Sequence, residues 1–333
     1  MSKRKLLSDS SRLLGLNYLL EHLPSKRGIL ILNHHRIGLP ETDPFDRAVI
    51  SATAEELDFQ VGYLKKKFPI LSGSELEDIL LSEKPLKHLH VAITFDDGYL
   101  DNYTTAFPIL QSHAMPAIFF LVSDFVGSNA IPWWDEIAYL MRHTELSELV
   151  LTTPGPTKIG LSGDRAPQIK SMLRRYVVTP AEQQADLLNE LRAQANVKIP
   201  PQPRRFLDWD EARRMVDAGM TIGAHTRTHP VLSRLTPDDQ RSELQTSKAE
   251  IEARLGRPVT TLAYPIGGPE AFDSITEKIA TDAGFRLCFT FTGAINDPNQ
   301  TVKTRVSRIE PSSHPSLFRF ETAFLSRTGR RPF

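Results

Sequence analysis

The sequence predicts an α/β fold with a mainly parallel sheet, because short apolar runs alternate along the chain with segments of helical periodicity. The runs at 28–33, 90–95 and 116–122 are almost continuously apolar, which is typical of strands buried on both faces. Gly256 and Gly284 directly follow helical segments, where helices commonly end. The chain has no internal repeat and no low-complexity segment that would favour another architecture.

The first half of the chain holds these three predicted strands and the helices between them. A Thr-x-x-Glu capping box at 53–56 predicts a helix that continues to about Phe68. A Ser-x-x-Glu sequence at 74–77 has the same spacing and predicts the start of a second helix. A third helix is expected around 104–113, between the second and third strands.

The segment 128–205 differs in character and is predicted to be an insertion. It carries the sequence Trp-Trp-Asp-Glu at 133–136. We expect two helices in it, at 133–143 and 180–195, with a loop that contains Pro, Gly and Thr between them. After the insertion the alternation resumes, with helices expected at 208–218, 237–255 and 273–283 and strands at 220–224, 259–263, 285–292 and 302–309.

The N-terminal leucines between Leu6 and Leu23 recur at helical spacing behind a basic sequence at 3–5. One interpretation is a helix packed on the domain, and the other is a helix at a membrane surface or against a partner. Polar residues interrupt the segment, so it has neither the apolar region of a signal peptide nor the ~20 apolar residues of a membrane span. We therefore expect a cytoplasmic protein, with the inner membrane face as the alternative location.

Charge and cysteine content exclude several classes of protein. Forty basic and forty acidic residues cancel, which predicts no nucleic-acid partner. The single cysteine, Cys288, excludes an internal disulfide and is typical of a reducing compartment. Its apolar neighbours predict a buried, unreactive thiol.

Two adjacent carboxylates, Asp96 and Asp97, follow the second predicted strand. At the end of a buried strand they would repel each other and lose hydration, and a cation would relieve both costs. One carboxylate could then ligate a metal while the other stays anionic beside it. The alternative is a tight Asp-Asp-Gly turn at 96–98 whose acidic side chains face solvent.

Two pairs of histidines also follow predicted strands. His225 and His229 have a spacing that would place both imidazoles on one side of a helical turn, within reach of one metal. His34 and His35 are neighbours and project differently, so we expect only one of them to face a site. The alternatives are unrelated loop histidines and a surface pair.

Together these residue types supply the parts for metal-assisted amide hydrolysis. Two histidines and a carboxylate form a three-ligand metal set that leaves room for water. The metal could acidify that water and polarise a carbonyl. The second carboxylate could act as the base, and a further histidine could protonate the leaving amine.

The sequences Thr-Phe-Asp-Asp-Gly at 94–98 and His-Thr-Arg-Thr-His at 225–229 resemble two motifs of the NodB-type polysaccharide deacetylases, carbohydrate esterase family 4. The resemblance covers about residues 28–310 and implies a distorted (β/α)7-type barrel, the NodB homology fold. It also implies one divalent metal, with Zn2+ expected and Co2+, Mn2+ or Ni2+ as alternatives. The resemblance assigns Asp96 as the catalytic base and Asp97, His225 and His229 as the metal ligands.

The family's third motif, which resembles Arg-x-Pro-Tyr, has a divergent counterpart in Ala-Tyr-Pro-Ile-Gly at 263–267. The Arg that would orient Asp96 is absent, and Arg308 on the last predicted strand is a candidate to replace it. Ile266 stands where the motif has Tyr, but its backbone N–H could still stabilise an oxyanion, because a backbone donor does not depend on the side chain. The remaining residues expected at the substrate site are Tyr264, Pro265 and Trp209, of which Trp209 is equally expected in the core.

The catalytic acid of the family is commonly a histidine near the C-terminal end, where this chain has His314 without a predicted strand. A subgroup that acts on exopolysaccharides instead carries a Tyr-His-Arg-like motif on its first strand, and Asn-His-His-Arg at 33–36 resembles it. Alignment on His-Arg selects His35 as the acid. The Trp-Trp-Asp sequence at 133–135 also resembles this subgroup.

These observations predict an N-terminal helical segment at 1–27, a deacetylase domain at 28–310 with the insertion at 128–205, and a C-terminal tail at 311–333. The predicted function is metal-dependent removal of N-acetyl groups from an N-acetylated sugar of a polysaccharide or glycan precursor. The alternatives are an amidase on a non-carbohydrate substrate and a catalytically silent protein that binds metal or glycan. A carbohydrate is the expected partner, peripheral membrane contact through 6–23 is an alternative, and the sequence predicts no oligomeric state.

Overall fold

The computed structural model describes Leu20 and residues 23–329. Seven parallel strands form one sheet in the order β1-β4-β5-β8-β9-β10-β11. Just past the last strand, Ile309 bridges Leu32 of β1, so the sheet closes into the distorted (β/α)7-type barrel that the sequence predicts. The strands are β1 (Gly28–His34), β4 (Leu89–Phe95), β5 (Ile118–Leu121), β8 (Thr221–Ala224), β9 (Thr261–Ala263), β10 (Leu287–Thr290) and β11 (Val306–Ser307).

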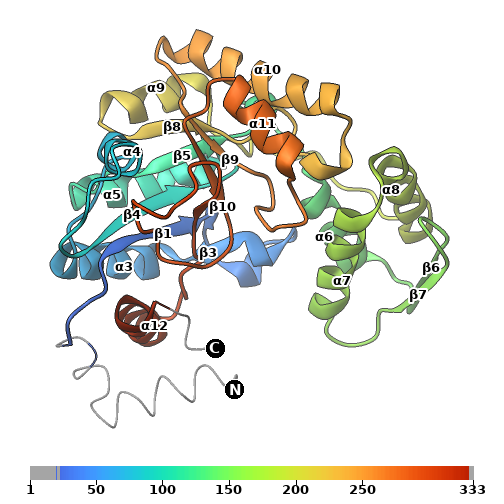
Figure 1. Cartoon of the computed structure of the whole chain (residues 1–333). Helices are drawn as coiled ribbons and strands as arrows, with labels where there is room; N and C mark the ends of the chain where they lie inside the picture. The colour runs from blue at the N-terminus through green and yellow to red at the C-terminus, as the bar shows by residue number, and fades with distance from the viewer. Residues whose placement is uncertain (1–19, 21–22, 330–333) are drawn as a thin grey trace.

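Helices surround the barrel (Figure 1). One turn of π-helix at Asn102–Ala106 leads into α5. The capping box of α4 is formed by Ser72 and Glu75, so the start expected from the sequence at 74–77 is wrong by two residues. The helices are α3 (Ala54–Lys67), α4 (Gly73–Leu81), α5 (Phe107–Ser112), α9 (Trp209–Asp217), α10 (Pro237–Leu255) and α11 (Ser274–Asp282).

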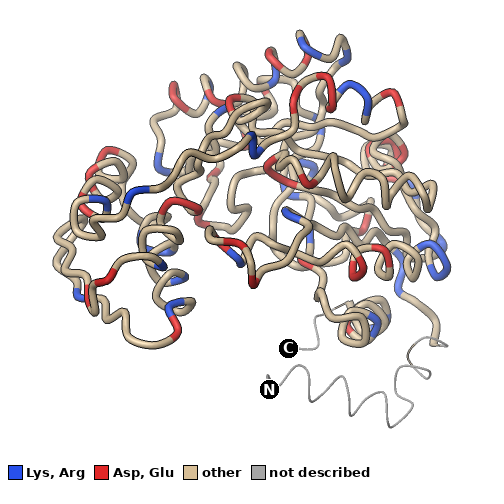
Figure 2. Tube along the Cα trace, turned by 180° about the vertical axis from the view of Figure 1, so that it is seen from behind, with Lys and Arg blue, Asp and Glu red and all other residues tan. Residues whose placement is uncertain are grey.

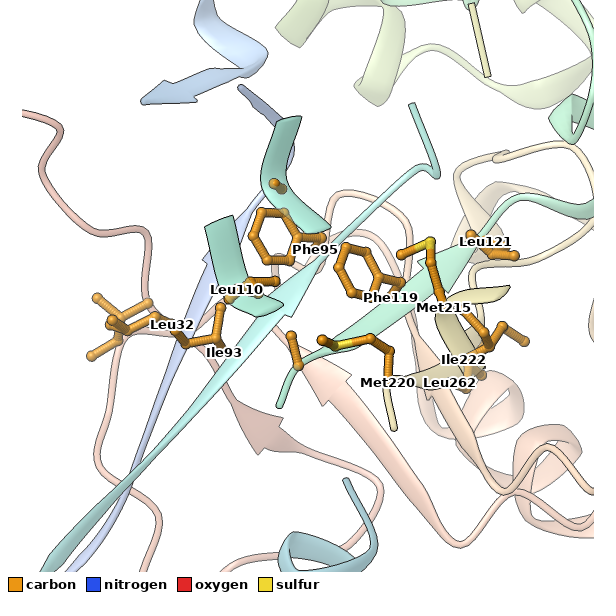
Figure 3. Close-up of a cluster of buried hydrophobic side chains, with 14 of the residues drawn as sticks. Leu32, Ile93, Phe95, Leu110, Phe119, Leu121, Met215, Met220, Ile222 and Leu262 are labelled. Atoms are coloured by element: carbon orange, nitrogen blue, oxygen red, sulfur yellow. The ribbon is translucent and has the colours of Figure 1, made fainter. Parts of the chain in front are cut away.

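The main hydrophobic core lies between the sheet and these helices. Phe95 of β4 stacks on Phe119 of β5 with ring centroids 4.8 Å apart, and Figure 3 shows aliphatic and methionine side chains packed around this pair. Along β1, Leu30 and Leu32 belong to this core, whereas Ile29 belongs to a second apolar cluster. Alternate side chains of a strand point to opposite faces, so β1 is buried on both of them, as predicted.

The inserted segment forms a lobe to one side of the barrel (Figure 1). Two of its helices were predicted, but the expected loop between them is wrong. That stretch holds an antiparallel hairpin and a further helix, which share a separate hydrophobic cluster with the predicted helices. The elements of the lobe are α6 (Trp133–His143), β6 (Glu148–Leu151), β7 (Thr157–Gly160), α7 (Ala166–Val178) and α8 (Ala181–Ala195).

The end of the chain is helical where the sequence predicted only a tail. Helix α12 (Pro315–Thr328) packs beside α3, with the rings of Phe318 and Tyr63 meeting edge to face at 5.9 Å. The helix predicted at 6–23 lies outside the described residues apart from Leu20, which packs on α12, and Leu23.

Charge is distributed evenly over the described part of the molecule. Figure 2 shows basic and acidic residues interspersed along the trace of both the barrel and the lobe. None of the helices described is long and apolar enough to span a lipid bilayer.

Candidate active site

Polar side chains from the ends of several strands meet in a pocket of about 430 Å³ at one rim of the barrel. In a parallel α/β fold, the carboxyl ends of the strands meet at one rim, which is where such sites form. Helices α6 and α7 of the lobe supply further walls of the pocket. Among its lining residues are His35, Asp96, Asp97, His225, His229, Ile266 and Arg308, all of them predicted from the sequence.

Asp97, His225 and His229 form a buried cluster in which one ligand atom of each lies within 4.8 Å of the others. Asp97 Oδ1 lies 3.5 Å from Nε2 of each histidine and has no hydrogen-bond partner. Burial and the neighbouring charge of Asp96 raise the pKa of Asp97 well above its usual range. A divalent ion would compensate this carboxylate, and one oxygen with two imidazole nitrogens suits such an ion, so the residues fit a metal.

His225 is oriented by a hydrogen bond on the far side of its ring. Its Nδ1 lies 2.7 Å from the carbonyl oxygen of Ala263, and since a carbonyl only accepts, Nδ1 carries the proton. The lone pair of Nε2 is therefore left on the side of Asp97, as metal binding requires. Burial lowers the pKa of His225 to about 4, which keeps the ring neutral.

His229 is held mainly through its backbone and by ring packing. Its N–H donates to Thr226 Oγ1 at 3.0 Å, and its carbonyl accepts from Trp133 Nε1 at 3.4 Å. Its ring packs against Trp134 with centroids 4.4 Å apart. Burial lowers the pKa of His229 well below its usual value.

Backbone strain is concentrated at this rim. The helical turn predicted for 225–229 is wrong, because Thr226 and His229 have φ values of 66° and 62° in a loop. Asp97 and Ile266 also have positive φ, at 72° and 66°. Non-glycine residues adopt this region rarely, and they keep it where the surrounding structure holds them, commonly at functional sites. The left-handed residues here turn side chains of three different loops toward one pocket.

Asp96 is held as an anion by a buried arginine. Arg308 is 1% exposed, and its Nη1 and Nη2 donate to the two carboxylate oxygens at 2.6 Å and 2.9 Å. Asn33 donates to Oδ2 at 3.0 Å and accepts from Arg308 through its own Oδ1 at 2.8 Å. Burial acts to raise the pKa of Asp96, but the charge and the hydrogen bonds of Arg308 outweigh it, so the pKa lies below the usual range. Arg308 therefore orients Asp96, the role for which the sequence made it a candidate.

The adjacent histidines face opposite sides, as the sequence predicts. His35 lines the pocket, and its Nε2 lies 4.0 Å from Asp96 Oδ2. His34 is fully buried, stacks on Phe95 with centroids 5.1 Å apart and pairs through Nε2 with Gln60 Oε1 at 2.9 Å. Only His35 can therefore meet a substrate.

Three residues predicted at the substrate site do not line the pocket. Trp209 packs on the main core, and the guanidinium of Arg254 lies 5.8 Å from its ring centroid. Tyr264 is fully buried and stacks on Phe272. Pro265 accepts a hydrogen bond from Gly267 within the turn, which leaves Ile266 as the pocket residue of 263–267.

Two other sequence predictions concern cysteine and the C-terminal histidine. Cys288 is fully buried, and burial raises the pKa of its thiol to about 12, which confirms the predicted buried thiol. His314 precedes α12 as its N-cap residue, with its Nδ1 3.0 Å from the Ser316 hydroxyl, and does not line the pocket.

Several pocket residues were not predicted from the sequence. Asn33 ends the apolar run of β1. A polar residue at the end of a buried strand was the feature of the sequence that could have indicated its place in the pocket. Trp133 and Trp134 lie on the helix predicted at 133–143, but the sequence did not predict that they line the pocket. Leu173 and Val177 come from α7, in the stretch where the sequence predicts a loop.

Comparison with known proteins identifies similar sequences. The model of a family described as "Polysaccharide deacetylase" matches residues 83–288. YxkH of Bacillus subtilis strain 168 is 22% identical over 253 residues, which are 75% of this chain and 62% of YxkH. The poly-beta-1,6-N-acetyl-D-glucosamine N-deacetylase of Escherichia coli K12 is 30% identical over 104 residues, 31% of this chain and 15% of that protein. The chain thus spans less than two thirds of either relative.

A solved structure shares the fold over most of the chain. The Streptococcus pyogenes deacetylase PplD, in complex with acetate, superimposes with a TM-score of 0.58 and 19% identity, covering 90% of this chain and 98% of that one. The stretch matched by the family model contains Asp96, Asp97 and both histidines of 225–229. His35 and Arg308 lie outside that stretch, so their place at the site comes from the structure.

Proposed function

The chain belongs to the polysaccharide deacetylase family, and on this premise we propose that it is a metal-dependent hydrolase that removes N-acetyl groups from an N-acetylated sugar of a polysaccharide or glycan precursor. The observation that carries the proposal is a carboxylate, Asp96, held anionic by Arg308 beside a three-residue set suited to a metal. The Escherichia coli relative is named for N-deacetylation of such a polymer, and the PplD structure contains acetate, the acid that this reaction releases.

The metal-binding residues would be Asp97, His225 and His229, with Zn2+ expected and Co2+, Mn2+ or Ni2+ as alternatives. When bound, the ion polarises the acetamide carbonyl and makes the attacking water more acidic. Asp96 takes a proton from this water while the water oxygen bonds to the carbonyl carbon. Arg308 and Asn33 fix the orientation of Asp96, so its proton-accepting oxygen is already in place before the substrate binds.

His35 completes the proposed reaction. It donates a proton to the sugar nitrogen as the C–N bond breaks, which yields acetate and a free amine. The backbone N–H of Ile266 stabilises the negative charge that develops on the carbonyl oxygen. His35 and Ile266 both line the pocket beside Asp96, which supports these roles.

Acetate release tests the proposal. The purified protein, with its metal content measured, is incubated with N-acetylhexosamine polymers, lipid-linked N-acetyl sugars and nucleotide sugars. Asp96→Asn should retain the metal and lose turnover by about 10²-fold or more, because the base is removed and the ligands stay. Asp58→Asn, at an exposed carboxylate on α3, is the matched control and should act like the wild-type protein. A metal-loaded protein that releases no acetate from any of these sugars would refute the proposal.

The acid is assigned by a second pair of variants. His35→Gln should lower turnover by about 10²- to 10⁴-fold, whereas His34→Gln, whose side chain points away from the pocket, should retain it. Equal activity of the two variants would mean that another group protonates the amine.

A further inference from the structure

A chain of buried contacts leads from His229 into the inserted lobe. Trp134 of α6 packs on the His229 ring, and its Nε1 donates to the Tyr99 hydroxyl at 2.9 Å. That hydroxyl donates in turn to Asp135 Oδ2 at 3.0 Å. Tyr99 directly follows the Asp-Asp-Gly turn of the barrel, whereas Trp134 and Asp135 belong to the lobe. The contacts therefore join the two parts at the proposed metal site.

Asp135 is the point where these parts meet. Its carboxylate is fully buried and pairs with Arg205 Nη2 at 2.6 Å, at the other end of the insertion. Its second oxygen accepts the backbone N–H of Asp46 at 3.0 Å, and Asp46 itself lines the pocket. Buried charges of this kind require several partners, and Asp135 has partners from three separate segments, at Asp46, Tyr99 and Arg205.

His229 needs such support more than His225 does. A histidine that binds metal usually donates its other ring N–H to a carboxylate or carbonyl, which fixes the ring. His225 has this bond to Ala263, but Nδ1 of His229 is buried without a hydrogen-bond partner. The ring orientation of His229 is therefore left to the packing of Trp134 and to the hydrogen bond from Trp133 to its carbonyl.

We propose that Asp135, acting through Tyr99 and Trp134, is a positioning residue for His229. Helix α6 of the lobe is then part of the metal site, since it sets the angle at which one ligand approaches the ion. The inference rests on the metal-binding role proposed above for His229.

The affinity of the metal-free protein for Zn2+ tests this inference without any substrate. Tyr99→Phe removes the hydroxyl that joins Trp134 to Asp135 but keeps the ring, which stacks on Phe206. Competition with a chelator should show affinity weakened by about tenfold or more, the usual effect of losing a group that orients a ligand. Trp134→Phe and Asp135→Asn should weaken it to a similar extent.

A matched control is Tyr103→Phe. Its hydroxyl accepts a hydrogen bond from Arg214, away from the pocket, so affinity should stay within about twofold of wild type. The absorption spectrum of bound Co2+, which reports ligand geometry, should change in Tyr99→Phe and stay the same in Tyr103→Phe. A general loss of stability would not produce this spectral difference in folded protein.

The outcomes separate this inference from the proposed function. Wild-type affinity and an unchanged Co2+ spectrum in folded Tyr99→Phe and Trp134→Phe would overturn the inference, even if the protein releases acetate. Weakened Zn2+ binding in both variants would support it, even if the wild-type protein releases no acetate. If Tyr99→Phe does not fold, Trp134→Phe decides by the same two measurements.

Discussion

Asp96 and Asp97 are adjacent, equally buried carboxylates whose pKa values shift in opposite directions. Burial acts on both in the same way, so the difference comes from their partners. Asp96 has the guanidinium of Arg308, whereas one oxygen of Asp97 has no hydrogen-bond partner and faces two imidazoles. The neighbours therefore give the first residue the properties of a base and the second those of a metal ligand.

The ion pair between Arg308 and Asp96 should matter for stability as well as turnover. Arg308→Gln leaves a buried carboxylate without its cation, so we expect the free energy of unfolding to fall by about 3–5 kcal/mol in urea titrations. Arg305→Gln is the matched control, because Arg305 pairs with Glu277 near the surface. This substitution should lower the free energy of unfolding by less than about 1 kcal/mol. Equal effects of the two substitutions would contradict the buried ion pair.

The buried His34 should make stability depend on pH. Burial lowers its pKa to about 4, from 6.5 in its unperturbed state. As the pH falls from 6.5 toward 4, the unfolded chain binds a proton that the folded protein does not, so the free energy of unfolding decreases, by up to about 3 kcal/mol. Above pH 6.5 both states hold a neutral ring, and the effect is absent.

His34→Gln isolates this contribution, because its amide can still reach Gln60 but does not titrate. Urea unfolding at about pH 7 and about pH 4 should show a smaller loss of stability in the variant than in the wild-type protein. The same loss in both proteins would show that His34 is protonated in the folded state.

Residue type and spacing made Asp96, Asp97, His225 and His229 candidates at strand ends, and the resemblance to the deacetylase motifs assigned them to one site. They were not enough to predict which way each loop side chain points. The prediction for Tyr264 was wrong because the positive φ of Ile266 turns the backbone there, so that Ile266 lines the pocket while Tyr264 is buried. Such a turn depends on tertiary packing rather than on local sequence.

At the scale of elements, apolar periodicity predicted every strand of the barrel and most of its helices, but the lobe less well. Helix α7 buries Ile169, Met172 and Tyr176, a helical spacing that the Pro, Gly and Thr residues before it obscured. The hairpin of β6 and β7 was missed because each strand has only four residues and β7 contains one large apolar residue, Ile159. Helix α12 begins with Pro315 at its first turn, which is a start signal that could have been read.

The start of α4 gives a test at this scale. The Ser72 hydroxyl accepts the N–H of Glu75, so Ser72→Ala should lower the free energy of unfolding by about 1 kcal/mol. Ser74 lies inside the helix, where Ala is favoured. Ser74→Ala should therefore leave the free energy of unfolding unchanged or raise it slightly. Thermal or urea unfolding of the two variants measures the difference. If Ser74→Ala costs more, the helix begins where the sequence pattern alone had placed it.

At the scale of the whole molecule, closure of the barrel assembles the site from both ends of the chain. The backbone of Ile309 pairs with Ile31 and Asn33 of β1, which brings Arg308 beside β1 and β4. Arg308 reaches Asp96 across 212 residues of sequence in this way. The sequence could suggest Arg308 as a candidate, but the register of the closing strand, which decides the contact, is not readable from a two-residue strand.

The metal should link the site to the stability of the whole fold. An ion that binds the folded chain but not the unfolded chain stabilises the folded state. The gain is about 2.7 kcal/mol when the free ion concentration is 100 times the dissociation constant of the ion. Treatment with a chelator should therefore lower the midpoint of thermal unfolding by several degrees, and Zn2+ should restore it. Asp97→Ala should remove the response to Zn2+, because it removes the ligand that follows β4 and leaves two histidines of a single loop. A variant that still responds fully would place the stabilising ion elsewhere, since Asp97 is what ties the loop after β8 to the loop after β4.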